Sequence, residues 1–303
     1  MRTIKFFAYS LMITSGMILT SCGSDDSDGG GRPPIGGYDN ADQVGADDLV
    51  AYFPLDGNGK EDVSGAMPSS STNVTWVDGV KGKAAKLSAG YLDYEPMANL
   101  STSMPSMTIS LWAKVNNNGG PDAVNPHATM LFQLSKPGDW AGNINVMSET
   151  SWYAPGVDTL VVKGYVKIKM PDGAENGQDS RNSPKPSPDD IEAGHVGNAN
   201  KNAGKWAHYV ITWDATNGFF RVYANGQKIS NPMWESRNGG EALGLNFFTP
   251  TRPIIGTFAS VIAGGADAWQ KSMDGEIDEI RVYKKVLIQQ DIAALYQLEL
   301  AGR

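Results

Sequence analysis

The sequence predicts an all-β fold, an antiparallel β-sandwich with one short C-terminal helix. Apolar and polar residues alternate over many short segments, as they do from Met107 to Val115. Turns rich in glycine and asparagine separate these segments, which is typical of antiparallel sheets. Helical periodicity is clear only over residues 289–298, where Ile292, Leu295 and Tyr296 form one apolar stripe.

The strongest turn signal is Asn225-Gly226, which lies between residues 219–224 and residues 227–230. A two-residue type I′ turn needs positive φ at both central positions, and asparagine and glycine adopt it at the lowest cost. We therefore predict a β-hairpin here. By alternation and β-propensity the other predicted strands are residues 49–53, 85–87, 91–94, 130–134, 160–170, 206–213, 254–258 and 276–283.

The first 21 residues have the features of an export signal. Arg2 and Lys5 precede an apolar run over residues 6–19 that is short for a transmembrane helix. Leu-Thr-Ser-Cys at residues 19–22 resembles a bacterial lipobox, which implies that Cys22, the single cysteine, is lipidated. Residues 22–46 begin with Gly, Ser and Asp and are predicted to form a flexible tether.

The acidic cluster after Cys22 resembles the signals that send some lipoproteins to the outer face of a Gram-negative outer membrane, which implies a lipoprotein displayed on the cell surface. The alternative is that the cluster is only a solvated linker. Removing residues 1–21 takes two of the 25 basic residues and leaves 23 against 33 acidic ones. Such a negative surface repels phosphate backbones, which argues against nucleic acid as a partner. Residues 47–303 are expected to form one domain.

Three blocks in the chain resemble, in order, the LamG-like domains of the concanavalin A-like lectin/glucanase superfamily. The first is residues 51–65 with residues 79–84, and the second is residues 108–114 with the hairpin region 205–226. The third is residues 273–283 with the helix that follows. The resemblance implies a jelly-roll sandwich. It also implies a long insertion at about residues 116–204, of which residues 171–204 read as a loop.

Glycosidases of this superfamily place carboxylates on one strand in a pattern that resembles Glu-x-Asp-x-x-Glu. Glu276 and Asp278 match its first half, but position 281 is arginine. Glu279 is at an odd offset and is expected on the opposite face of the strand, unless a β-bulge turns it. A retaining mechanism needs two carboxyl groups about 5 Å apart. We therefore assign no catalytic residue, and a glycoside hydrolase remains an alternative.

Many LamG-like domains hold a structural calcium ion, and the resemblance implies Asp56, Asp62, Ser64 and Asp278 as its ligands here. Calcium prefers carboxylate and carbonyl oxygens, which these positions offer. The alternative is that Asp62 stabilises a turn and Asp278 pairs with a basic side chain.

Aromatic side chains in Gly-, Asn- or Ser-rich sequence are the candidates for binding sugar, because an aromatic face stacks on the apolar face of a pyranose. They are Trp140, Trp152, Tyr153, Trp234 and Trp269. The sequence thus predicts a non-catalytic surface lipoprotein that binds a polysaccharide or oligosaccharide, as an accessory to other surface glycan-uptake proteins. A protein-binding adhesion module is the second alternative, because fold alone does not fix function.

Overall fold

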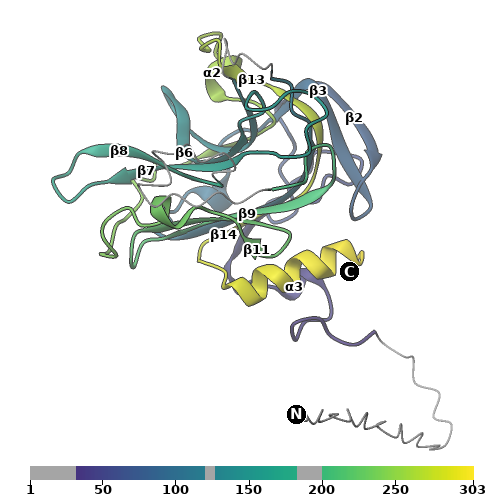
Figure 1. Ribbon diagram of the computed structural model, residues 1–303, viewed down its shortest axis with the longest axis horizontal. Coiled ribbons are helices and arrows are strands. Elements are labelled where there is room, and N and C mark those ends of the chain that lie inside the picture. The colour runs from purple at the N-terminus through teal and green to yellow at the C-terminus, as the bar shows by residue number, and fades with distance from the viewer. Residues whose placement is uncertain (1–31, 120–126, 183–199) are drawn as a thin grey trace, which may run out of the picture. The chain divides into compact units, whose positions relative to one another are not determined.

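The computed structural model describes residues 32–119, 127–182 and 200–303. By its internal contacts the chain forms a large folded unit over residues 34–303 (Figure 1). Its strands are antiparallel, except that β13 pairs in parallel with β5. The strands are β1 (Leu49–Phe53), β2 (Ser70–Asp78), β3 (Lys83–Asp93), β4 (Met107–Val115), β5 (Ala128–Lys136), β6 (Asp139–Ser148), β7 (Val162–Lys169), β8 (Glu175–Arg181), β9 (Ala207–Asp214), β10 (Phe219–Ala224), β11 (Gln227–Lys228), β12 (Arg252–Ile255), β13 (Gln270–Lys271) and β14 (Met273–Tyr283).

One hydrogen-bonded sheet runs β11-β10-β9-β4-β14-β3-β12-β5-β6-β7-β8 and folds over on itself. β1 and β2 pair with β14 and β3. The fold brings β7 over β9 and β10, so that Gly164 lies against Ile211 and Phe220. The result is a two-layer sandwich, with β14 and β9 in one layer and β6–β8 in the other (Figure 1). This confirms the predicted fold class.

The main core lies between the two layers and is built from alternate residues of the strands. Leu111, Phe132, Val146, Trp213 and Ile277 belong to it and are fully buried. β-branched and aromatic side chains suit the pleated, half-buried surface of a strand, which explains why these segments become strands. Burying such side chains supplies the main driving force for closing the sandwich.

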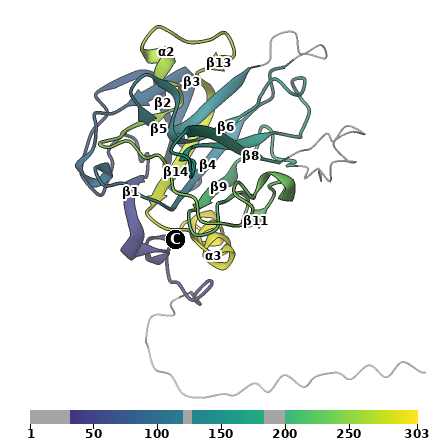
Figure 2. The same ribbon diagram turned by 90° about the vertical axis from the view of Figure 1, so that its left-hand side faces the viewer.

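The helices lie outside this core. α3 (Gln289–Leu300) covers the outer face of the β14 layer (Figure 2), and its Ile292 and Leu295 pack on Tyr283. This agrees with the helix predicted at residues 289–298. α2 (Ala259–Ile262) packs near β6, and the short 3-10 helices are η1 (Ala41–Gln43), η2 (Ala46–Asp48), η3 (Ala98–Leu100) and η4 (Pro232–Trp234).

The folded unit begins earlier in the chain than predicted. Residues 34–46 were expected to form part of the tether, but they belong to the folded unit. Ala41 and Val44 are buried beneath α3, and the Tyr38 hydroxyl donates to Asp291 of α3 at 2.9 Å. The expected insertion at about 116–204 supplies β5–β8, most of the second layer, and the loop expected at 171–204 contains β8 (Glu175–Arg181).

The predicted hairpin is confirmed. Asn225 and Gly226 have φ angles of 48° and 77°, as a type I′ turn requires. Asn225 is fixed to β9, because its N–H donates to the His208 carbonyl at 2.8 Å and its side chain accepts from the His208 N–H at 2.9 Å.

β14 contains a β-bulge between Asp278 and Arg281, where its pairing with β4 shifts register. Glu279 sits in the bulge with a φ of 48°, which is costly for a side chain with a Cβ. The bulge turns Glu279 onto the same face as Arg281, and its carboxylate accepts from Arg281 at 3.0 Å. The expectation that Glu279 points to the opposite face is therefore wrong, because a β-bulge turns this residue.

Arg281 is the centre of a buried ion-pair network and has no exposed surface. Its guanidinium donates at 2.9 Å to Glu299 of α3, at 3.0 Å to Glu279 and at 2.9 Å to Asp42 of η1. It also lies 3.9 Å from the ring centre of Tyr52. Burial opposes the charge, but the Glu299 carboxylate raises the pKa of Arg281 above its usual value. The network joins the closing strand to both ends of the folded unit.

His208 lies beside this network, between β9 and α3, and is fully buried. Its Nε2 is 2.6 Å from the Ser110 hydroxyl. Its ring stacks on Tyr296 and lies against Trp112 at a tilt of 40°. Burial and the charge of Arg281 lower the pKa of His208 to about 3, so the ring is neutral at neutral pH.

We predict that Arg281→Met destabilises the fold by about 3–5 kcal/mol, because it leaves buried carboxylates without their counter-charge. Lys285→Met is the control, because Lys285 forms a half-exposed ion pair with Asp48 and should cost less than about 1 kcal/mol. Urea unfolding curves measure both. Equal losses in the two variants would contradict a structural role for the network.

We predict that His208 makes the fold sensitive to acid. The unfolded chain takes up a proton near the ordinary pKa of 6.5, but the folded chain does so only near 3, so stability falls as pH falls through this window. At about pH 4.5 this contribution amounts to roughly 2–3 kcal/mol. The free energy of unfolding, measured with urea at pH 7 and pH 4.5, should fall between these two pH values by that much less in His208→Gln than in wild type. An unchanged pH dependence would refute the assignment.

Candidate functional site

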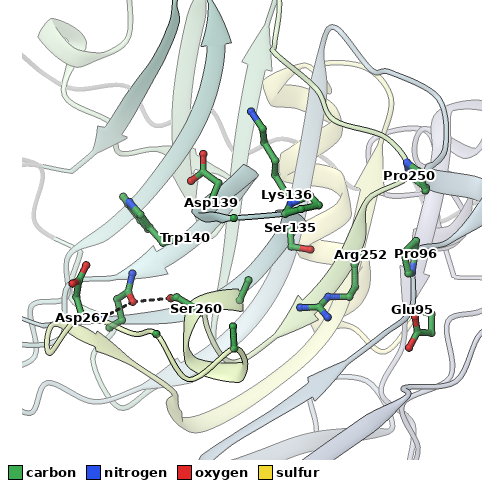
Figure 3. A pocket seen from close by; sticks show the side chains of 16 residues that line it. Glu95, Pro96, Ser135, Lys136, Asp139, Trp140, Pro250, Arg252, Ser260 and Asp267 are labelled. Atoms are coloured by element: carbon green, nitrogen blue, oxygen red, sulfur yellow. Dashed lines mark hydrogen bonds between the residues drawn. The ribbon is translucent and has the colours of Figure 1, made fainter.

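A pocket of about 640 Å³ opens at one end of the second layer (Figure 3). Pockets of this size commonly hold small ligands. It lies between the β5–β6 turn, β12, α2 and the segment that leads to β13. The residues that line it are Glu95, Pro96, Ser135, Lys136, Pro137, Gly138, Asp139, Trp140, Pro250, Arg252, Ala259, Ser260, Ala263, Gly265, Asp267 and Gln270.

Trp140 gives the pocket an aromatic wall. It is half-buried and packs against Tyr165, Trp269 and Phe258, with ring centres 5.0, 4.9 and 6.3 Å away. Tyr165 alternates along β7 with Val166 of the main core, so this cluster lies on the opposite, outward face of the second layer. The packing holds the indole of Trp140 in place at the pocket.

Ion pairs surround the polar side of the pocket. Lys136 bonds to Glu175, and Arg252 lies 3.3 Å from Asp93. The hydrogen bond from Lys136 lowers the pKa of Glu175, whereas burial raises that of Asp93. Asp139 is 3.1 Å from Lys167. Because Lys136, Arg252 and Asp139 are all paired, this side of the pocket is polar but nearly balanced in charge.

Gln270 adds a fixed amide to the wall near Trp269. Its Oε1 accepts from the Ser260 hydroxyl at 2.7 Å and from the Asp267 N–H at 2.9 Å. Its Nε2 is buried and has no hydrogen-bond partner among the described residues. A donor of this kind, next to an aromatic ring, is suited to an oxygen-rich ligand such as a sugar.

The structure places four of the five predicted ligand-binding aromatics in two separate groups. Trp140 and Trp269 lie together at the start of β6. Trp152 and Trp234 enclose the Arg181 guanidinium, 4.9 and 3.8 Å from the two ring centres. Trp152 follows the far end of the ten-residue β6, so the groups are about 30 Å apart along the strand. Tyr153 is 8% exposed, so little of its ring is available for stacking on a ligand.

The carboxylates of β14 lie away from the pocket, none of whose lining residues is on that strand. Glu276 pairs with Lys114 at 3.1 Å. Asp278 and Glu279 are completely buried. Burial and then the Glu279 charge raise the pKa of Asp278 to about 7. The three carboxylates share one face but are enclosed by protein contacts.

The four residues implied as calcium ligands do not surround one point in the described structure. Asp278 accepts from the N–H groups of residues 80, 81 and 279, and Asp56 accepts from the Lys83 N–H at 2.6 Å. Asp62 is exposed and pairs with Lys60. Ser64 donates to the carboxylate of the preceding Glu61. Among the described residues no group of three or more His, Cys, Asp or Glu could hold a metal ion.

The sequence signalled the pocket only in part. Trp140 and Trp269, which packs against it, were predicted. The lining residues Arg252, Ser260 and Gln270 were not, because they come together only through β12, α2 and β13. The turn Lys-Pro-Gly-Asp at residues 136–139, directly before Trp140, was the available local signal. Cys22 lies outside the described residues. Within those residues, no helix has the length and apolar character needed to cross a membrane.

The chain belongs to the concanavalin A-like lectin/glucanase superfamily, whose Laminin_G_3 family model matches residues 88–293. This confirms the predicted family and agrees with the two-layer architecture. A comparison with curated proteins finds no match.

Among solved structures, the chain is similar to the binding domain of Paraclostridial Mosquitocidal Protein 1. The TM-score is 0.51 and the identity 17%, over 82% of this chain and 52% of that one. Domain 4 of AbnA, a GH43 extracellular arabinanase from Geobacillus stearothermophilus solved with arabinotriose, has a TM-score of 0.46 and 18% identity, over 82% and 98% of the two chains. At such identities the first likeness shows the fold alone. The chain spans about half the length of that first structure.

We predict that Arg181→Ala destabilises the fold by about 1–2 kcal/mol, because it removes the cation from between Trp152 and Trp234. The fluorescence of the folded state should change as the indoles lose this contact. Arg221→Ala is the control, since the guanidinium of Arg221 lies over the ring of Phe219, 4.5 Å from its centre, and phenylalanine contributes little to the measured fluorescence. Identical fluorescence in wild type and Arg181→Ala would contradict the stacked arrangement.

Proposed function

We propose that this chain is a non-catalytic carbohydrate-binding lipoprotein and that the pocket beside Trp140 binds its glycan. The observation that supports this best is a fixed indole next to a pocket with paired charges and a buried, unpartnered amide donor. Proteins bind sugars mainly by stacking an aromatic ring on the apolar face of the pyranose and by directed hydrogen bonds to its hydroxyl groups. Membership of a superfamily that includes lectins is consistent with it.

Lipidation at Cys22 would anchor the domain in the outer membrane, at the surface of a Gram-negative cell. A single lipid chain binds membranes weakly, so stable anchoring needs more than one. The proposed partners are a polysaccharide or oligosaccharide and other surface glycan-uptake proteins. The lipobox-like residues and the export signal support this part of the proposal.

A structural calcium ion remains a proposal that comes from the family resemblance. To bind the ion, Asp62 would have to leave Lys60, with which it is paired. Asp278 would have to bind the ion in place of, or in addition to, the backbone amides that it now accepts from. Binding assays should therefore be run with calcium and with chelator.

A glycan array on the purified chain tests the proposed function. We expect retention of at least one polysaccharide without release of shorter sugars, and loss of that retention in Trp140→Ala. Because Trp140 also packs in the aromatic cluster, Asp267→Ala serves as a second variant, whose exposed side chain lines the pocket. Asp267→Ala should weaken binding by about 3- to 10-fold and leave thermal stability unchanged.

Trp234→Ala is the matched control, because that indole lies in the other aromatic group. If it abolished binding while the pocket variants did not, the site would be wrongly placed. Release of shorter sugars would make the chain an enzyme. Retention of no glycan at all would favour the protein-adhesion alternative.

A further inference from the structure

Phe248 is an exposed aromatic residue that the described fold holds in one position. Its exposure is 41%, whereas its neighbours Leu245 and Phe247 pack against the main core. Leu245 also forms a bridge to Ile168 of β7. The inward side chains anchor the segment, and alternation directs Phe248 outward.

Two hydrogen bonds tie the backbone of Phe248 to β6. The Asn143 side chain accepts from the Phe248 N–H at 2.7 Å and donates to the Phe248 carbonyl at 3.0 Å. Asn143 is 1% exposed and lies on the strand that also carries Trp140. The ring of Phe248 is therefore attached to the same rigid strand as the aromatic wall of the pocket.

Phe248 is two residues before Pro250, which lines the end of the pocket that is remote from Trp140. Figure 3 shows Trp140 and Asp267 on one side, and Pro250, Pro96 and Glu95 on the opposite side. Consecutive Cα atoms are at most about 3.8 Å apart, so Phe248 is within about 8 Å of Pro250. An extended ligand that leaves the pocket past Pro250 would reach this ring.

We infer that the glycan site continues from Trp140 through the pocket onto Phe248, so that its ligand is a stretch of several sugar units of a polysaccharide and not a single terminal sugar. The inference rests on the proposed function and specifies its substrate class. Single exposed apolar side chains are common on protein surfaces. Phe248 differs because its backbone is fixed beside the pocket, so stacking on it costs little conformational entropy.

The test uses the full chain and a ladder of oligosaccharides, from two to eight units, prepared by partial hydrolysis of the polysaccharide that the array retains. Phe248→Ala should lower affinity for the longest members by about 2- to 12-fold and leave affinity for the shortest unchanged. Phe248→Tyr should bind like wild type, whereas Phe248→Leu, which is apolar but has no ring face, should behave like Phe248→Ala. Titration calorimetry measures all four proteins.

Leu300→Ala is the control, because Leu300 is 57% exposed on α3 and remote from the pocket. It should bind every length like wild type. If Phe248→Ala lost affinity equally for all lengths, or for none, while Trp140→Ala lost binding, the extension would be wrong and the proposed function would stand. If the wild type retained no polysaccharide, the proposed function itself would fail.

Discussion

The burial of the Arg281 guanidinium is the constraint on which the closure of this domain depends. A charge without exposed surface is tolerated only where carboxylates and hydrogen bonds replace water. Glu279, Glu299 and Asp42 provide them from the bulge in β14, from α3 and from η1. Because Glu299 and Asp42 come from the two ends of the folded unit, these carboxylates reach the guanidinium only when both ends dock on the closing strand. The bulge, with its left-handed Glu279, follows from this requirement.

The same arrangement explains why carboxylates that resemble a glycosidase pattern are enclosed here. The bulge does bring Glu279 to the face that carries Glu276 and Asp278, as catalysis would need. That face is, however, covered where Glu279 lies, and the Glu279 carboxylate bonds to Arg281 and the Tyr52 hydroxyl. Glu279 thus takes part in the ion-pair network that holds the domain together, whereas Glu276 pairs with Lys114 and Asp278 accepts from backbone amides.

The candidate site lies in the other layer and depends on aromatic packing, whereas the network of Arg281 depends on buried ion pairs. Its aromatic cluster is formed on the outward face of β6 and β7 and is completed by α2 and the segment before β13. Most of its lining is apolar or carries charges that are already paired, which suits a neutral, oxygen-rich ligand better than a highly charged one. Because the ion-pair network of Arg281 and the pocket lie on separate layers, substitutions in the pocket lining need not disturb the network.

The local pattern of apolar, polar and turn-forming residues determined a large part of the secondary structure of this protein. Alternation fixed β1, β4, β9 and β14, the Asn225-Gly226 turn fixed its hairpin, and the apolar stripe fixed α3, because each depends on neighbours along the chain. β2, β6 and β8 escaped prediction, since their sequences are polar or interrupted by glycine and become strands through pairing with partners. The place of residues 34–46 was likewise decided by packing under α3. The sequence singled out the aromatic candidates for sugar binding. Only tertiary structure decided that Trp140 lines a pocket and packs against Trp269, while Trp152 and Trp234 lie against an arginine. Such convergence depends on strand order and register, which bring together residues far apart in the chain.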